Sequence, residues 1–371
     1  MDSKEQTPSF ENGKPVTTIT QISRPFFTHA EISYLHGQTI EESKKLSYNQ
    51  IKNQIFTLLY QVIKQLKFPL RVLGTTMNYY QRFYLFHKFV PDSGNEDPFI
   101  VAMSCLLLAS KNEDCIKKLK DIQSVVNKLR DIDENKLVEN PENTKETIAV
   151  VELQRKLILA TEFKLLQLIK FDFSNGANSL SIRTSVDCLL VQFCKQLDIN
   201  YRMSSLCWLI CFDIMSTPLC LVIPPHCIAV SIIIISLNLK FKDLKLIHHE
   251  IDEDKDDEKL SAILDSLDCE RDFKTPEVLV NEGILYILDY YIHQYNYSIL
   301  NNYLPDNKKQ QSRFMELKEK FIDLKNMNEV SCKESLNKTD EYLNKWEFNN
   351  KGIARFMLGN KRRRFNKELN N

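Results

Sequence analysis

The sequence contains few of the residues that form turns between β-strands and that build phosphate-binding loops. Of its 371 residues only 8 are glycine and 12 are proline, too few turn formers for a β-sandwich or barrel with many short strands. Neither a G-x-G-x-x-G nor a Walker-type loop is present, which excludes the common glycine-rich nucleotide sites. These absences favour a mostly helical protein without a nucleotide cofactor.

The chain also lacks an excess of charge of either sign, since lysine plus arginine and aspartate plus glutamate number 49 each. No net field therefore draws the whole protein to nucleic acid or to a membrane. The polar N-terminus shows no secretory signal pattern. The ten cysteines form no Cys-x-x-Cys pair, and most lie in apolar stretches, as free thiols do in a reducing compartment.

We expect neither a metal site nor another cofactor. The nearest metal-like grouping is Cys220, His226 and Cys227, which lies among apolar residues and has no fourth ligand at a recognisable spacing. No nucleophile with an adjacent base is visible, because His29, His36 and His87 are scattered among polar or aromatic neighbours. The chain is therefore not expected to be an enzyme.

Apolar residues spaced three and four apart predict a series of helices in the first half of the chain. The stretch 1–45 is polar and is expected to be a loosely ordered arm, and the acidic stretch 131–143 an exposed loop. The third helix is apolar almost all round, which is typical of a helix wrapped by its neighbours. The expected helices cover about 51–66, 71–86, 99–110, 120–130 and 145–170.

The second half of the chain repeats the first. Residues 98–109 align without a gap on residues 225–236, matching Ala102 with Ala229 and Ser104 with Ser231. Two tandem five-helix bundles follow from this repeat, so the fold class is all-α. Further helices are expected at about 181–197, 203–215, 258–267 and 276–293.

The apolar block 206–239 invites the alternative of a membrane span. Asp213 and three prolines interrupt it, so neither half offers about 20 uninterrupted apolar residues, and a buried core helix is expected instead. The C-terminal region 297–371 is polar, with a helix at about 306–326, and carries a basic run at 361–364. A solvated tail and a nuclear-import or nucleic-acid contact both remain open for that run.

Three segments, at 80–84 (YQRFY), 105–114 (CLLLASKNED) and 161–172 (TEFKLLQLIKFD), give the chain a resemblance to the cyclins, specifically the transcription cyclins of types C, K, T and L. The segment 68–83 resembles the cyclin subunits of fungal kinases that phosphorylate the RNA polymerase II C-terminal domain. The resemblance places a first cyclin box at 46–173 and a second at 178–296, between an arm at 1–45 and a tail at 297–371.

The resemblance also implies where a kinase binds. In cyclins a lysine and a glutamate approach each other and bind backbone groups beside the kinase C-helix, and the matching positions are Lys111 and Glu162. A lysine at the end of an apolar helix favours the negative helix terminus, and a glutamate among apolar neighbours is only partly solvated. The alternative is an exposed surface pair contributing about 0–1 kcal/mol.

The same motifs assign further kinase-binding positions to Glu113, Asp114, Leu166 and Phe171. The sequence departs from the family where Asp114 replaces a glutamate, which puts the choice of kinase in doubt, and where Gln81 replaces the aspartate of cell-cycle cyclins. The segment at 49–66 lacks the Met-Arg-Ala-Ile-Leu patch that recruits substrates in cell-cycle cyclins, as expected for the transcription branch.

The resemblance implies a nuclear regulatory subunit, with the cytoplasm left open, that binds and activates a cyclin-dependent kinase catalytic subunit. The complex would phosphorylate the RNA polymerase II C-terminal repeats in support of elongation, with a third regulatory subunit left open. No membrane and no direct nucleic-acid contact are expected. The competing interpretation is a TFIIB-like transcription factor that binds DNA, but the first 45 residues contain no cysteine for a zinc ribbon. A helical scaffold without a kinase is a third possibility.

Overall fold

Two apolar helices of 15 residues each, α4 (Pro98–Asn112) and α9 (Pro225–Leu239), lie at the centres of two helical bundles. Almost every side chain of both helices is buried, because apolar residues occur all around them and only surrounding helices can remove such a surface from water. Asp97 caps the first, with its Oδ1 accepting from the Phe99 N–H at 2.9 Å. The central helix expected in each repeat is therefore confirmed.

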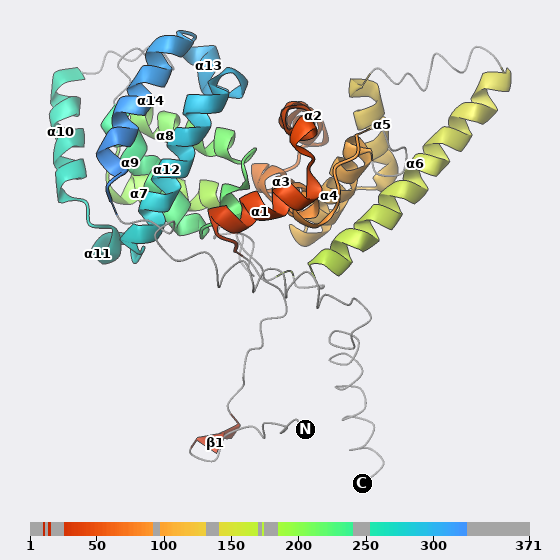
Figure 1. Ribbon diagram of the computed structural model, residues 1–371, viewed down its shortest axis with the longest axis horizontal. Helices are drawn as coiled ribbons and strands as arrows, with labels where there is room; N and C mark the ends of the chain where they lie inside the picture. Colours follow the sequence, from red (N-terminus) through yellow and green to blue (C-terminus); the bar gives the residue numbers. More distant parts are fainter. Residues whose placement is uncertain are drawn as a thin grey trace.

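In the first bundle four helices surround α4, and in the second four surround α9 (Figure 1). The first four are α2 (Lys45–Leu66), α3 (Leu70–Phe86), α5 (Leu119–Leu129) and α6 (Pro141–Leu168). The second four are α7 (Val186–Gln196), α8 (Tyr201–Ile214), α10 (Glu253–Ser266) and α12 (Glu277–Gln294).

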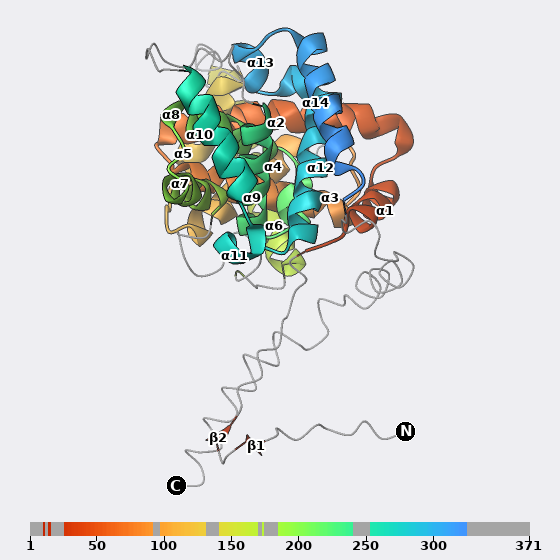
Figure 2. The ribbon, with the colours of Figure 1, turned by 90° about the vertical axis from the view of Figure 1, so that its left-hand side faces the viewer.

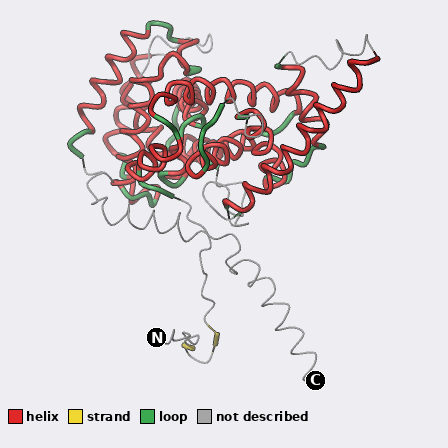
Figure 3. The backbone as a smooth tube through the Cα atoms, turned by 45° about the vertical axis from the view of Figure 1, so that its right-hand side comes forward, coloured by secondary structure: helices red, strands yellow, loops and turns green. Residues whose placement is uncertain are grey.

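The computed structural model shows a chain that is helical almost throughout its described part (Figure 3). Besides α1 and α14, which are described below, the remaining elements are η1 (Glu42–Lys44), η4 (Pro218–Leu221), α11 (Cys269–Phe273), η5 (Tyr295–Tyr297), α13 (Leu300–Tyr303) and a ribbon of β1 (Phe10–Glu11) and β2 (Lys14–Pro15). The structure describes residues 10–11, 14–15, 26–91, 97–130, 141–169, 173, 185–239 and 253–324. Most of the expected loop at 131–143 and the basic run at 361–364 lie outside these residues, although α6 already begins at Pro141.

The aligned serines show that the repeat is structural. Ser104 Oγ is a hydrogen-bond donor that lies 2.8 Å from Ile100 O and 3.0 Å from Ile158 O. The second contact joins α4 to α6. Ser231 Oγ lies in the same way at 2.8 Å from Cys227 O and 2.9 Å from Val280 O, tying α9 to α12. A small residue at this position lets the fifth helix of each bundle approach the central one closely.

A helix forms where the sequence suggested only a polar arm. In α1 (His29–Thr39) Thr28 and Glu31 make a capping box, with each side chain accepting from the other's backbone N–H. Phe27, Ile32 and Leu35 are buried, so this segment belongs to the core. Polar residues between these apolar ones obscured the helical period, and the capping signal at 28–31 was the available clue.

The helical body also extends beyond the expected end of the second box at 296. The helix expected at 306–326 is present as α14 (Asn307–Phe321), but it packs onto the second bundle instead of standing in solvent (Figure 2). Its Phe314 is fully buried and stacks on Tyr291 at 4.7 Å between ring centroids. The predicted domain boundaries stay a prediction, and the packed helices reach past them at both ends.

The two bundles share a packed junction. Phe212 of α8 contacts Phe56 and Tyr60 of α2, with ring centroids 5.1 and 4.9 Å apart. Gln81 of α3 is buried and donates from Nε2 to Thr217 O at 2.8 Å. The glutamine that departs from the family pattern thus bridges the two halves.

None of the helices in the described ranges is both long and apolar enough to cross a membrane. The block 206–239 is divided between α8, η4 and α9, and most of its side chains lie in the second core. The buried core helix expected for this block is confirmed.

Asp213 is a buried carboxylate in the second core, where burial raises its pKa to about 7. Its Oδ1 accepts from Ile299 N–H at 2.6 Å, and Oδ2 accepts from Tyr291 Oη at 2.9 Å. The folded state therefore holds a proton that the unfolded chain has released, between the ordinary carboxyl pKa of 3.8 and about 7. The contribution of Asp213 to the free energy of unfolding falls as pH rises through this window.

We expect Asp213→Asn to remove this part of the pH dependence, because an amide does not titrate. Urea unfolding at a series of pH values from 4 to 8 would measure it, with exposed Asp265→Asn in α10 as the control. The difference in the free energy of unfolding between the wild type and Asp213→Asn should change with pH below 7 and become constant above it. A pH-independent difference would contradict the assignment.

Candidate functional site

Lys111 and Glu162 meet at one end of the first bundle. Lys111 lies in the last turn of α4 and Glu162 in α6, and Lys111 Nζ donates to Glu162 Oε1 at 2.6 Å. The Lys111 side chain is 45% exposed and that of Glu162 only 8% exposed. The pair is thus accessible from one side and backed by protein on the other.

The surrounding helices explain this placement. α6 is held against α4 by the Ser104 bond and by Leu165 and Leu168, which are buried in the first core. These contacts fix the turn of α6 that carries Glu162 beside the C-terminal end of α4. The lysine also lies at the negative end of its helix dipole, which favours its charge there.

The pair keeps hydrogen-bonding capacity for another molecule. An ammonium group has three donors, and within the described ranges Lys111 uses one, on Glu162. Glu162 Oε2 accepts no hydrogen bond there. Two donors and one charged acceptor can therefore bind backbone carbonyls and N–H groups of a partner, and such ionic bonds are stronger where water is excluded.

The two carboxylates that follow Lys111 differ in their exposure to solvent. Glu113 is turned inward, where it accepts from Thr75 Oγ1 at 2.6 Å and from Arg71 Nε at 3.2 Å. Asp114 is exposed and has a left-handed backbone, with φ of 54°. Aspartate tolerates this conformation better than most residues, and the turn ends α4 sharply beside the pair.

The structure therefore divides the predicted kinase-binding residues. It pairs Lys111 with Glu162 and leaves Asp114 exposed three residues after Lys111, whereas Glu113 binds α3 within the chain. Leu166 is half-buried against the first core, and Phe171 lies outside the described residues. Arg71 and Thr75, which hold Glu113, were missed as supporting residues, because no local pattern pairs positions about 40 residues apart.

Glu113→Ala should lower the free energy of unfolding by about 1–3 kcal/mol, because it leaves the Arg71 guanidinium and the Thr75 hydroxyl without their partner. Urea unfolding would measure this loss. Asp114→Asn is the matched control, since asparagine also tolerates the left-handed backbone, and it should change stability by less than about 0.5 kcal/mol. Equal effects of the two substitutions would contradict the supporting role of Glu113.

Comparison with known families decides which fold this is. Residues 24–174 match the cyclin N-terminal domain. The chain contains a cyclin N-terminal domain. The matched range starts ahead of α1, so the family's N-terminal domain takes in the helix that the sequence had placed in a polar arm.

Relatives of this chain include two proteins named as kinase subunits. It is 29% identical over 308 residues to "CTD kinase subunit beta" of Saccharomyces cerevisiae, covering 82% of each chain. It is 28% identical over 299 residues to "CTD kinase subunit beta" of Schizosaccharomyces pombe, covering 80% of this chain and 76% of the relative. A shorter match, 37% identical over 110 residues, joins it to "Cyclin pch1" of Schizosaccharomyces pombe, covering 30% of this chain and 29% of the relative.

A solved structure agrees with these relatives. The chain matches a chain of the yeast RNA polymerase II CTD kinase CTDK-1 complex with a TM-score of 0.66 and 27% identity. The match covers 90% of this chain and 94% of the other. The similarity therefore includes both helical bundles, and this chain is homologous to the yeast CTD kinase beta subunits over about four fifths of its length.

Proposed function

We propose that this chain is the beta subunit of a kinase that phosphorylates the RNA polymerase II C-terminal domain. The observation that carries the proposal is the similarity to two CTD kinase beta subunits along about 80% of the chain. The chain is the regulatory subunit, and the phosphoryl transfer belongs to a cyclin-dependent kinase catalytic subunit. A role in transcription elongation and a nuclear location follow from this substrate.

Activation follows from the surface around Lys111 and Glu162. A protein kinase is active only when its β3 lysine pairs with its C-helix glutamate and its activation loop is ordered. A cyclin shifts that equilibrium only by binding the active arrangement more tightly than the inactive one. The Lys111 donors and the Glu162 oxygen that make no hydrogen bond within the described ranges bind backbone groups beside the C-helix and hold it inward.

The neighbouring residues have separate roles in this proposal. Asp114 is exposed beside the pair and contacts the kinase directly, whereas Glu113 positions the end of α4 through Arg71. Leu166, half-buried on α6, adds an apolar contact to the kinase, and the family motif assigns the same role to Phe171, which lies outside the described residues. A third regulatory subunit has room on the remaining surface of the two bundles.

Co-purification with a catalytic subunit, followed by a kinase assay on C-terminal repeat peptides, tests the proposal. We expect a stoichiometric kinase and serine phosphorylation that rises with added cyclin until it saturates. A TFIIB-like protein would instead bind DNA with an affinity that falls steeply with salt, so a salt titration with duplex DNA separates the two functions. A pure chain with neither kinase nor DNA binding would contradict both.

A further inference from the structure

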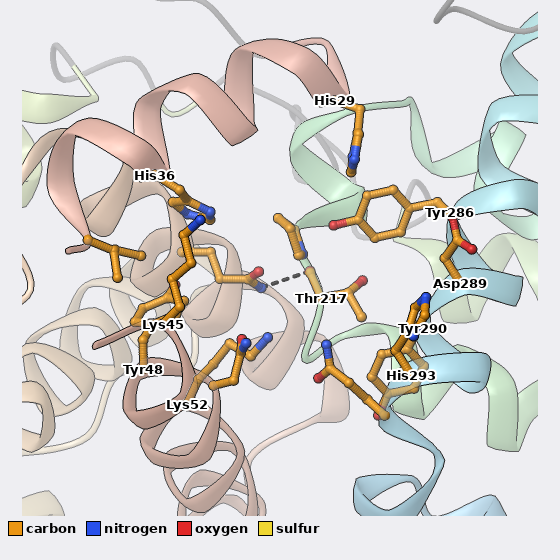
Figure 4. Close-up of a pocket in the computed structure, with 15 residues that line it drawn as sticks. His29, His36, Lys45, Tyr48, Lys52, Thr217, Tyr286, Asp289, Tyr290 and His293 are labelled. Atoms are coloured by element: carbon orange, nitrogen blue, oxygen red, sulfur yellow. Dashed lines mark hydrogen bonds between the residues drawn. The ribbon is translucent and has the colours of Figure 1, made fainter. Parts of the chain in front are cut away.

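A cavity of about 280 Å³ lies between the two bundles, on a part of the molecule that the kinase surface does not use. In Figure 4 His36 of α1 and Lys45 and Lys52 of α2 lie on one side, and Tyr286, Tyr290 and His293 of α12 on the other. Thr217, which precedes η4, lies between them. The cavity is thus built from segments that only the folded junction brings together.

Lys52 is the unusual group in this cavity. Its side chain is only 4% exposed, and in the described part of the chain no carboxylate lies within ion-pair distance of its Nζ and no hydrogen bond to it is found. Burial lowers the pKa of Lys52 to about 8. A buried lysine without a counter-ion is destabilising, and natural proteins pair such groups or use them to bind a ligand.

A second buried polar group faces the same space without a partner. His36 Nε2 is buried and makes no hydrogen bond within the described ranges. Burial, followed by the charges of Lys52, Lys45 and His29, lowers the pKa of His36 to about 4. The imidazole is therefore neutral at pH 7 and offers one N–H donor, and the proximity of several cations confirms that positive charge gathers here.

The acidic groups nearby are already engaged. Asp289, the carboxylate that lines the cavity, accepts from Lys318 Nζ. Lys45 has Glu42 as its partner and is about half exposed, so it marks an edge open to solvent. His29 contacts Tyr286 edge-on at 5.3 Å. After these pairings, the charge of Lys52 remains without compensation.

We propose that this cavity binds a phosphate group, anchored by Lys52 and reached past Lys45. A phosphate dianion supplies the missing counter-charge and several acceptor oxygens for donors that converge from α1 and α2. Gln81, whose Nε2 donates to Thr217 O, lines the cavity and fixes its geometry across the junction. The volume is below that of ordinary small-molecule pockets, so it suits one phosphate group better than a nucleotide.

Phosphate bound here would contact both bundles at once. His36 belongs to α1 and Lys52 to α2, whereas His293 and Tyr290 belong to α12. A ligand that binds only the folded junction stabilises it in proportion to its concentration. The same group could come from free inorganic phosphate or from a phosphorylated serine or threonine side chain that enters past Lys45.

Calorimetric titration of the full chain tests the proposal, first with inorganic phosphate and then with a short phosphoserine peptide and its unphosphorylated form. We expect saturable binding, and a rise in Tm with phosphate, for the wild type. Lys52→Met should weaken binding by about tenfold or more, since it removes the one buried ionic donor. Lys64→Met, at an exposed position of the same helix, should bind as the wild type does.

The two sources give different outcomes. Tighter binding of the phosphoserine peptide than of inorganic phosphate identifies a phosphorylated side chain as the ligand, and equal binding identifies the free ion. Circular dichroism checks that Lys52→Met is folded. His36→Phe gives a second test at the same site. No saturable binding by the folded wild type, or equal binding by Lys52→Met, would overturn the proposal. No kinase is needed, so this result is independent of the proposed activation.

Discussion

Glu162→Arg is expected to weaken kinase activation strongly while leaving the helical bundles folded. The substitution removes the acceptor of the 2.6 Å bond from Lys111 and places two cations beside each other at the kinase-binding surface. Removing one partner of a buried, hydrogen-bonded charge pair at an interface costs about 2–5 kcal/mol of binding. The concentration of cyclin needed for half-maximal activity should therefore rise by at least about thirtyfold.

The matched control is Glu152→Arg on the same helix. Glu152 is exposed and pairs with Arg155 at 3.7 Å. It lies ten residues before Glu162, about 15 Å along the helix. It changes the net charge by the same amount but should leave activation unchanged. Far-ultraviolet circular dichroism of both variants checks that the helices remain. Equal loss of activity in the two variants would mean that charge alone, and not this site, is responsible.

Gly283→Ala is expected to destabilise the second bundle strongly. Gly283 lies in α12 where this helix crosses α9, and an added Cβ would clash with Ser231 Oγ and approach Ile223 Cδ1 to 2.7 Å. Ser231 cannot turn away without breaking its bonds to Cys227 O and Val280 O. We expect a loss of about 1–3 kcal/mol, even though alanine favours a helix over glycine by about 1 kcal/mol.

Gly37→Ala in α1 is the control for this prediction. An added Cβ at Gly37 meets nothing within 4 Å, so the change should be neutral or stabilise the protein by up to about 1 kcal/mol. Urea unfolding measures both variants. Combining Gly283→Ala with Ser231→Ala should recover part of the loss, because the clashing oxygen is gone. Equal stability of the two single variants would contradict the close packing of α9 and α12.

Much of the fold was predictable because the helical spacing of the apolar residues and the internal sequence repeat indicate the same helices. The apolar runs at 98–109 and 225–236 predicted two central helices, and their aligned serines occupy equivalent positions. The approach of Lys111 to Glu162 was also expected, but only through resemblance to a family, since 51 residues separate the two positions. Spacing alone gives no information about a contact of that kind.

What the sequence did not reveal depends on tertiary contacts. The inward turn of Glu113 follows from the left-handed backbone at Asp114 and from Arg71 on another helix. The cavity around Lys52 collects residues from α1, α2, η4 and α12, which no sequence motif could join. α14 looked like a solvated helix because few of its residues are apolar, and Phe314, Leu317 and Phe321 carry its apolar contact with the core.

Photo-crosslinking of the assembled kinase complex tests the central claim most directly. A photoreactive residue at exposed Asp114, beside Lys111 and Glu162, should crosslink to the C-helix of the catalytic subunit. The photoreactive residue in place of Tyr201 should give no crosslink to that helix. Tyr201 is 65% exposed and lies at the start of α8 in the second bundle. An intact, active complex in which position 114 crosslinks elsewhere, or to nothing, would contradict activation through this surface.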